Sequence, residues 1–274
     1  MSVLGEIATW PVPNAAAAVV APSGVLETFG DTARRFPLAS VTKPLAALTA
    51  LVAVEEEAIG LDDPMAADIV TGATVRHLFS HAGGLAMDRP VRSGEPGTRR
   101  VYSNIGIDLL AEAVTRGTGI GFEEYFQQAV AQPLHLTATT LGARPSRDGV
   151  SCVDDLAKVL AELLAPTGLL HPSTLAEATT VQFPGLRGVV PGFGPQRTND
   201  WGLGFEIRDH KQPHWTGATN SPATYGHFGQ SGTLLWVDPQ ARLGLVVLTD
   251  RDFDSWAAEA WPRLSDAVLA AYRT

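Results

Sequence analysis

The stretch FPLASVTKPLAALTALVAVEEEA, residues 36–58, carries more information about the fold than any other part of the sequence. From Ser40 to Ala58 the apolar residues lie almost all round a helical wheel, which predicts a buried helix. Pro44 fits this helix only if it falls in the first turn. Ser40 and Lys43 lie three residues apart on one helix face, so their side chains are within reach of each other.

The residues Ser40 and Lys43 have the chemistry of a nucleophile and its proton partner. A serine hydroxyl is a poor nucleophile until a base removes its proton, and desolvation at a helix N-terminus lowers the pKa of a lysine. Only three of the 20 basic residues are lysines, namely Lys43, Lys158 and Lys211. A lysine within an otherwise apolar helix is costly unless it is used, although Ser-x-x-Lys motifs also occur by chance.

Two further motifs could carry chemistry. Tyr102-Ser103-Asn104 belongs to a polar loop that enters a predicted helix, a place where side chains can project into a cleft. The alternative is a purely structural role, in which the motif caps the helix and the tyrosine packs against its neighbours. His227-Phe228-Gly229 lies in a glycine-rich segment just before a predicted strand. Glycines there indicate close approach of the backbone to another segment or to a ligand.

Hydrophobic periodicity predicts an α+β fold. Strands are predicted at residues 15–21, 25–29, 202–207, 233–237 and 243–249, and helices at residues 40–58, 107–116, 122–131, 156–165 and 255–272. Strands near both chain ends imply one antiparallel sheet built from the N- and C-terminal segments and flanked by helices. We expect residues 1–62 and 191–274 to form this sheet region, residues 63–190 to form an inserted, mainly helical region without a strand, and the site to lie in the cleft between them.

Composition excludes several classes of function. The chain has 274 residues and a formal net charge of −9, which disfavours binding to a nucleic acid. The single cysteine, Cys152, excludes an internal disulfide and has no metal-ligand spacing. His77 and His81 have the spacing of zinc-binding helices but lack the glutamate between them, so we expect no metal site.

The N-terminal segment argues for a location inside the cell. It contains no Lys or Arg before Arg34, so it lacks the positive region that opens a secretory signal. The longest apolar run, residues 44–54, is well short of the ~18 residues that span a bilayer. We therefore expect a cytoplasmic protein that is not embedded in a membrane.

Taken in chain order, Ser40-Val41-Thr42-Lys43, Tyr102-Ser103-Asn104 and His227-Phe228-Gly229 resemble the three signature motifs of the serine penicillin-recognising enzymes. The nearest branch comprises the class C beta-lactamases, the D-alanyl-D-alanine carboxypeptidases and the family VIII esterases. Similar flanking segments support the resemblance, which extends from about Asn14 to the C-terminus: residues 36–39, 59–64, 75–85 and 226–239. The resemblance implies a beta-lactamase/transpeptidase-like fold.

The resemblance also implies a role for each matching residue. Ser40 would be the acylated nucleophile and Lys43 its proton partner, while Tyr102 would be the general base, with Lys43 favouring its phenolate. The backbone N–H groups of Ser40 and Gln230 would form the oxyanion hole. The residues implied to contact the substrate are Asn104, His227, Gly229 and Gln230, with Asn104 holding a substrate amide or orienting Lys43. No cofactor is implied, because Lys43 and Tyr102 can supply the proton transfers.

One departure from the family pattern bears on the substrate. Typical class C beta-lactamases have a lysine at the position of His227, and its charge attracts the carboxylate of a beta-lactam. A histidine is mostly neutral at pH 7 and attracts it less. Trp201, Trp215 and Phe228 are candidates for the walls of an acyl pocket.

Three hypotheses follow from these motifs. The leading one is a cytoplasmic serine hydrolase that forms an acyl-enzyme at Ser40 and acts on small esters or amides, with esterase activity favoured. The second is a D-amino-acid peptidase, such as a DD-carboxypeptidase, or a weak beta-lactamase. The third, from a different class, is a non-catalytic recognition module; the presence of Ser40, Lys43 and Tyr102 gives it no support.

Overall fold

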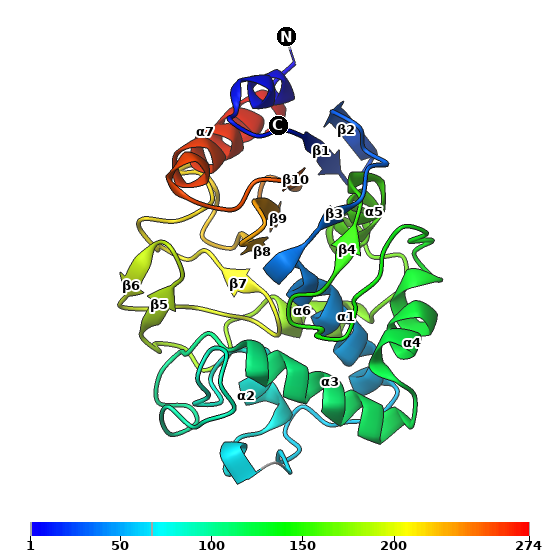
Figure 1. The fold of residues 1–274 in the computed structure, drawn as a ribbon, viewed down its shortest axis with the longest axis vertical. Coiled ribbons are helices and arrows are strands. Elements are labelled where there is room, and N and C mark those ends of the chain that lie inside the picture. The colour runs from blue at the N-terminus through cyan, green and yellow to red at the C-terminus, as the bar shows by residue number, and fades with distance from the viewer. Residues whose placement is uncertain (1, 67, 274) are drawn as a thin grey trace.

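The computed structural model describes residues 2–66 and 68–273 and has a sheet region beside a mainly helical region (Figure 1). The main sheet consists of β1 (Ala15–Ala21), β2 (Gly24–Phe29), β7 (Glu206–Ile207), β8 (Tyr225–Gly229), β9 (Thr233–Asp238) and β10 (Leu243–Thr249). Two small pairs are β3 (Phe36–Pro37) with β4 (Val150–Ser151), and β5 (Gly188–Val190) with β6 (Gly194–Gln196). The α-helices are α1 (Thr42–Glu55), α2 (Val75–Phe79), α3 (Asn104–Thr118), α4 (Phe122–Phe126), α5 (Val153–Leu164), α6 (Pro172–Ala178) and α7 (Ser255–Tyr272). Shorter turns of helix are η1 (Leu4–Thr9), η2 (Ala39–Val41), η3 (Asp68–Val70) and the π-helical η4 (Gln127–Ala131).

The main sheet joins the two ends of the chain. Its six strands run in the order β2-β1-β10-β9-β8-β7, and every neighbouring pair is antiparallel. β1 pairs with β10 from Ala15 opposite Thr249 to Val20 opposite Gly244. The predicted sheet built from terminal segments, and with it the α+β fold, is therefore confirmed.

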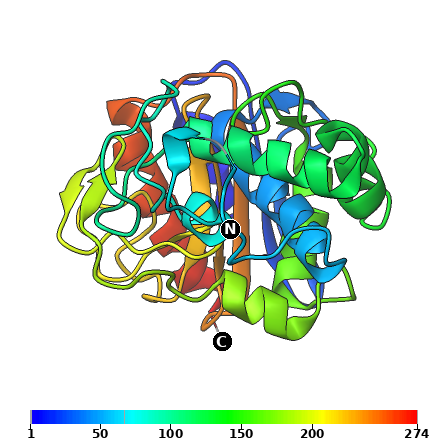
Figure 2. The same ribbon diagram turned by 90° about the horizontal axis from the view of Figure 1, so that it is seen from below.

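Helices cover both faces of this sheet, which explains why its central strands are apolar along their whole length. Side chains that alternate along β1 enter two separate cores: Val20 packs in the core that contains α1 and α5, and Val19 packs in the core that contains α7. Figure 2 shows α7, in red, and α1, in blue, on opposite sides of the strands.

The middle of the chain differs from the prediction in three details. α5 lies inside the predicted helical insertion but packs on the main sheet against β1 and β10. Residues 63–190 were expected to hold no strand, and this is wrong because β4 and β5 lie there. Of the strand predicted at residues 202–207, only β7 forms, because a turn at Gly204, with φ 85°, precedes it.

The helix predictions hold more closely. α7 has the predicted bounds, and the buried helix of residues 40–58 is found as η2 followed by α1, with Pro44 in the first turn of α1. Within the described residues, no helix combines the length and the apolar character needed to cross a membrane.

Candidate active site

Ser40 lies in a tight turn that several segments hold in place. Ala39 adopts a φ of 45°, a left-handed conformation that costs energy in a residue with a side chain. The Thr42 hydroxyl donates to the carbonyl of Ala39 at 2.6 Å and accepts from the N–H of Gly149 at 2.9 Å. On the other side, Thr233 donates its hydroxyl proton to the carbonyl of Leu38 at 2.8 Å. The turn is therefore supported from both the sheet and the helical region.

Lys43 is completely buried beneath the serine. Its Nζ lies 3.0 Å from Ser40 Oγ and donates to the carbonyl of Ser146 at 2.8 Å. Burial is the largest influence on the pKa of Lys43 and holds it well below its ordinary value, against the opposing charge of Asp108. The amine therefore loses its proton far more readily than a surface lysine.

Tyr102 completes a triangle around the serine hydroxyl. It lies in the loop before α3, and its OH donates to Ser40 Oγ at 2.7 Å, while Lys43 Nζ lies 4.7 Å from the centre of its ring. Burial raises the pKa of Tyr102 above its ordinary value, and its hydrogen bond to Ser40 opposes this only in part. In the uncomplexed protein Tyr102 is thus a neutral phenol that donates to the serine.

A cavity of about 300 Å³ opens at this triangle. Two of its walls are aromatic, Trp201 and Phe228, as expected from the sequence, whereas Trp215 lies buried outside the lining. The other lining residues are Ala39, Ser40, Met87, Asp88, Tyr102, Asn104, Arg147, Pro191, Glu206, His227 and Gln230. The structure therefore brings residues from both ends and the middle of the chain to one site.

Four cavity-lining side chains have a buried polar atom without a partner among the described residues: Asn104 Oδ1, Arg147 Nε, Trp201 Nε1 and His227 Nε2. His227 Nδ1 donates to the carbonyl of Phe228 at 2.7 Å, so Nε2 is an acceptor in the neutral ring. Burial, together with the charge of Lys43, lowers the pKa of His227 to about 3. At neutral pH His227 therefore brings a lone pair to the cavity and no positive charge.

Of the two roles expected for Asn104, contact with a substrate amide or orientation of Lys43, the hydrogen bonds do not show the second. Its Nδ2 donates to Asp88 Oδ1 at 2.8 Å, and the same carboxylate oxygen accepts from Arg147 at 2.5 Å. Among the described residues the partners of Lys43 are Ser40 and the carbonyl of Ser146, and Asn104 is not one of them. Asn104 is thus oriented by Asp88, which leaves its Oδ1 to accept a hydrogen bond.

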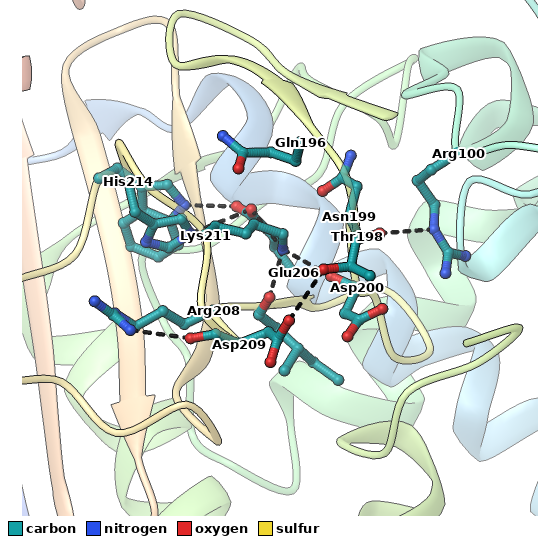
Figure 3. Close-up of polar contacts among 12 residues, drawn as sticks. Arg100, Gln196, Thr198, Asn199, Asp200, Glu206, Arg208, Asp209, Lys211 and His214 are labelled. Atoms are coloured by element: carbon teal, nitrogen blue, oxygen red, sulfur yellow. Dashed lines mark hydrogen bonds and ion pairs between the residues drawn. The ribbon is translucent and has the colours of Figure 1, made fainter. Parts of the chain in front are cut away.

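Glu206 adds an ionised carboxylate to the cavity wall. It accepts hydrogen bonds from Lys211 Nζ at 3.0 Å, His214 Nε2 at 3.2 Å and Trp215 Nε1 at 2.5 Å. Figure 3 shows the side chains of Lys211 and His214 converging on this carboxylate. Burial alone raises the pKa of Glu206, but the charge of Lys211 and the hydrogen bonds outweigh it and hold that pKa far below its ordinary range.

Gly229 and Gln230 position the backbone around the serine. A Cβ on Gly229 would lie 2.3 Å from the Leu38 carbonyl oxygen, so only glycine lets β8 approach the serine turn this closely. Gly229 itself does not line the cavity, whereas Gln230 does. The N–H of Gln230 makes no hydrogen bond to the described residues, so it is available to a substrate oxygen.

The sequence motifs identified Ser40, Lys43 and Tyr102 but not several residues that surround them in the site. Ser146, Asp88 and Glu206 come from loops and a short strand with no recognisable motif. The scarcity of lysine was a usable signal, because Lys211, singled out on that ground, is the partner of Glu206.

The two histidines with zinc-like spacing have separate partners. His77 Nδ1 bonds to the Thr74 hydroxyl at 2.9 Å, and His81 Nδ1 accepts from the N–H of Ser103 at 3.1 Å, directly beside Tyr102. In residues 2–66 and 68–273, no three His, Cys, Asp or Glu side chains gather closely enough to hold a metal ion.

The chain is similar to known proteins over nearly all of its length. A family model described as Beta-lactamase matches residues 12–269. A solved structure described as a beta-lactamase from Mycobacterium bovis is 55% identical, with each chain covered to 100% and a TM-score of 0.97.

Two curated proteins extend the comparison. Esterase EstB from Burkholderia gladioli is 24% identical, over 86% of this chain and 82% of that protein. Beta-lactamase from Escherichia coli (strain K12) is 30% identical over 41% of this chain, and the match spans only 36% of that protein's length. Because the family model spans the sheet, the helical region and the whole cavity, the chain belongs to the beta-lactamase family, within the serine beta-lactamase and transpeptidase-like superfamily.

Proposed function

We propose that this protein is a serine hydrolase that forms an acyl-enzyme at Ser40 and acts on small esters whose groups next to the reacting carbonyl are uncharged. The observation that carries the proposal is the triangle in which Lys43 Nζ and Tyr102 OH lie 3.0 and 2.7 Å from Ser40 Oγ. A nucleophile within hydrogen-bond distance of two proton-transfer groups is the arrangement that covalent catalysis requires. The likeness to esterase EstB is in line with this activity.

The pKa directions suggest the order of proton transfers. Lys43 takes the Ser40 proton as Oγ attacks the ester carbonyl carbon, and the N–H groups of Ser40 and Gln230 stabilise the oxyanion. When the carbon–oxygen bond to the leaving group breaks, Tyr102 donates its proton to that group, and the Lys43 ammonium then restores the phenol. A water molecule attacks the acyl-enzyme by the same route in reverse. This order assigns the base to Lys43, where the family resemblance implies Tyr102.

The preference for an uncharged group next to the reacting carbonyl rests on the charges of the cavity. His227 has a pKa of about 3 and is uncharged at neutral pH. Glu206, which lines the same cavity, is ionised. The charge of Glu206 is balanced by Lys211, and Arg147, which also lines the cavity, is paired with Asp88. A substrate carboxylate at this wall would therefore meet a neutral imidazole and ion pairs that are already formed, so we expect beta-lactams to be poor substrates.

A peptidase or amide hydrolase is the second candidate, and one observation favours it. Asn104 Oδ1 is a buried acceptor without a partner among the described residues, and it suits the N–H of a substrate amide. D-alanyl-D-alanine amides would use this contact, whereas simple esters have no such N–H.

Steady-state hydrolysis distinguishes these candidates. We expect p-nitrophenyl acetate and butyrate to be hydrolysed with kcat/KM at least about tenfold above that for nitrocefin, and a D-alanyl-D-alanine amide to fall below the esters. Ser40→Ala should remove the activity, while Ser23→Ala, at the exposed β1–β2 turn, should keep it. Comparable turnover of nitrocefin or of the amide would favour the second candidate, and unchanged activity in Ser40→Ala would refute the acyl-enzyme.

A further inference from the structure

We propose that a groove beside the catalytic cavity binds the distal part of the substrate, an apolar chain that ends in a carboxylate or another anionic group. This inference rests on the proposed function and specifies its substrate class. The groove has a volume of about 460 Å³ and shares Met87, Tyr102 and Pro191 with the catalytic cavity. A molecule that reacts at Ser40 can therefore extend past Tyr102 into it.

The walls of the groove are built from two segments that pack closely. One is the β5–β6 hairpin, and the other is the stretch that leads into Tyr102. The N–H of Arg100 donates to the carbonyl of Arg187 at 2.9 Å, and a Cβ on Gly188 would lie 2.7 Å from the Arg100 carbonyl oxygen. This close backbone contact fixes the relative position of the two segments and so gives the groove a defined shape.

The interior of the groove is largely apolar and open to solvent. Met87 is 41% exposed and Val189 is 55% exposed, two of the few large hydrophobic side chains of the described residues with such exposure. Pro191 and Pro195 continue the same lining. Exposed apolar surface that adjoins a catalytic cavity is typical of a ligand site.

The charged residues of the groove are all basic. Arg99 and Arg187 are exposed, and neither forms an ion pair within the described part of the chain. Beneath them, Arg100 is buried and donates to the carbonyl oxygens of Ser80 and Asn199 at 2.6 and 2.9 Å (Figure 3 shows the latter bond). Glu95, close in sequence, is paired with Arg92.

This concentration of positive charge runs against the composition of the protein. The chain has a net charge of −9, yet the groove presents two exposed arginines, Arg99 and Arg187, above the buried Arg100 and has no acidic lining residue. Guanidinium groups form strong, charge-assisted hydrogen bonds with carboxylates. An apolar floor with arginines at its edge therefore complements a chain that has an anionic end. Within the catalytic cavity, by contrast, neutral groups are preferred.

The test compares substrates that differ only at the far end of the chain. For the acyl side, the pair is p-nitrophenyl octanoate and the mono-p-nitrophenyl ester of octanedioic acid; for the alcohol side, it is octyl acetate and 8-acetoxyoctanoate. In wild-type protein we expect kcat/KM to be about tenfold higher for the anionic member of at least one pair. The pair with this preference identifies the side of the ester that occupies the groove.

Variants separate the groove from general effects. In Arg99→Ala/Arg187→Ala the preference for the anionic substrate should fall about tenfold, and 0.5 M salt should weaken the wild-type preference. Arg263→Ala, an exposed arginine on α7, is the matched control and should leave the preference unchanged. Equal kcat/KM for both members of both pairs, or a preference that survives in the double variant, would overturn the proposal.

A binding measurement keeps this inference independent of turnover. Calorimetric titration of Ser40→Ala with octanoate and with octanamide should give the tighter dissociation constant for octanoate, and Arg99→Ala/Arg187→Ala should abolish the difference. If Ser40 proves not to be acylated but octanoate binds in this arginine-dependent way, the groove stands and the proposed hydrolase fails. If both compounds bind equally, the groove is contradicted whatever the catalytic result.

Discussion

The residues around Ser40 make a testable statement about which group accepts its proton. Burial lowers the pKa of Lys43 and raises that of Tyr102. With Lys43 as the base, kcat/KM for p-nitrophenyl acetate should rise with pH through a single limb below the ordinary lysine value of 10.5. No limb should appear near 6.5, because the pKa of His227 is about 3.

A different pH profile is expected if Tyr102, rather than Lys43, accepts the proton. If the Tyr102 phenolate were the base, activity would rise only above pH 10, the ordinary tyrosine value. As a control, Tyr102→Phe should keep the acid limb of the profile while kcat falls by about 100-fold, because the group that takes the proton of the attacking water in deacylation has been removed.

The close packing at Gly229 gives a second prediction for a single residue. Its missing side chain allows β8 to lie against the carbonyl of Leu38, two residues before the nucleophile. Gly229→Ala should displace the serine turn and lower kcat by at least about 10-fold, with a smaller change in KM, because misplacement of a reacting atom mainly affects the transition state. Gly121→Ala, at a site with no atom within 4 Å of the added Cβ, is the control. An active Gly229→Ala would show that the turn is not held by this contact.

At the scale of single elements, sequence periodicity predicted the long helices and the apolar strands well. α7 and β10 have the predicted bounds because α7 has a helical hydrophobic period and β10 is a continuous apolar run. β8 was missed: Tyr225-Gly-His-Phe-Gly229 contains two glycines, which weaken a strand in isolation. Its pairing with β7 and β9 overrides that propensity. The glycines that hide the strand also let it approach the serine turn.

The loop after β7 depends on a buried ion pair. Lys211 and Glu206 are each 2% exposed, and their charged atoms lie 3.0 Å apart. Removing one partner of such a pair leaves an uncompensated buried charge, so Lys211→Met should lower the free energy of unfolding by about 3 kcal/mol. The double variant Glu206→Gln/Lys211→Met should recover part of this loss.

Lys158 supplies the control for that experiment. Its side chain is 43% exposed and pairs with Asp155, so Lys158→Met should cost less than about 1 kcal/mol in chemical denaturation. If Lys211→Met unfolds with the same free energy as wild type, the pair does not stabilise the wall of the cavity.

At the scale of the whole molecule, the site exists only because the fold joins distant segments. The pairs Ser40–Lys43 and Tyr102–Asn104 are local, and their motifs made them predictable. Ser146 and Glu206 contribute through contacts between segments about 100 residues or more apart, and no spacing rule applies to such contacts. The reacting groups could thus be predicted from the sequence, whereas the charges that line the cavity could be identified only from the structure.

Buried neutral histidines should make the whole protein sensitive to acid. Burial lowers the pKa values of His81 and His227 in the folded state, so only the unfolded chain gains these protons as the pH falls below 6.5. Stability is therefore complete above pH 6.5 and falls below it, by about 1.4 kcal/mol per pH unit for each histidine. His227→Gln should reduce this slope by one histidine's share in denaturant unfolding followed from pH 7 to 5. Ser23→Ala, at an exposed residue that does not titrate in this range, should leave it unchanged; equal slopes in all three proteins would contradict the burial argument.

The central claim, that Ser40 is an activated nucleophile, is tested most directly by peptide mapping after reaction with a fluorophosphonate probe, which forms a stable adduct. We predict one adduct, on the peptide that contains Ser40, in wild type and in Ser23→Ala, and none in Ser40→Ala. Lys43→Ala should label far more slowly, because the hydroxyl then lacks its proton acceptor. A wild-type protein that stays unlabelled, or an adduct on any other side chain, would contradict the account.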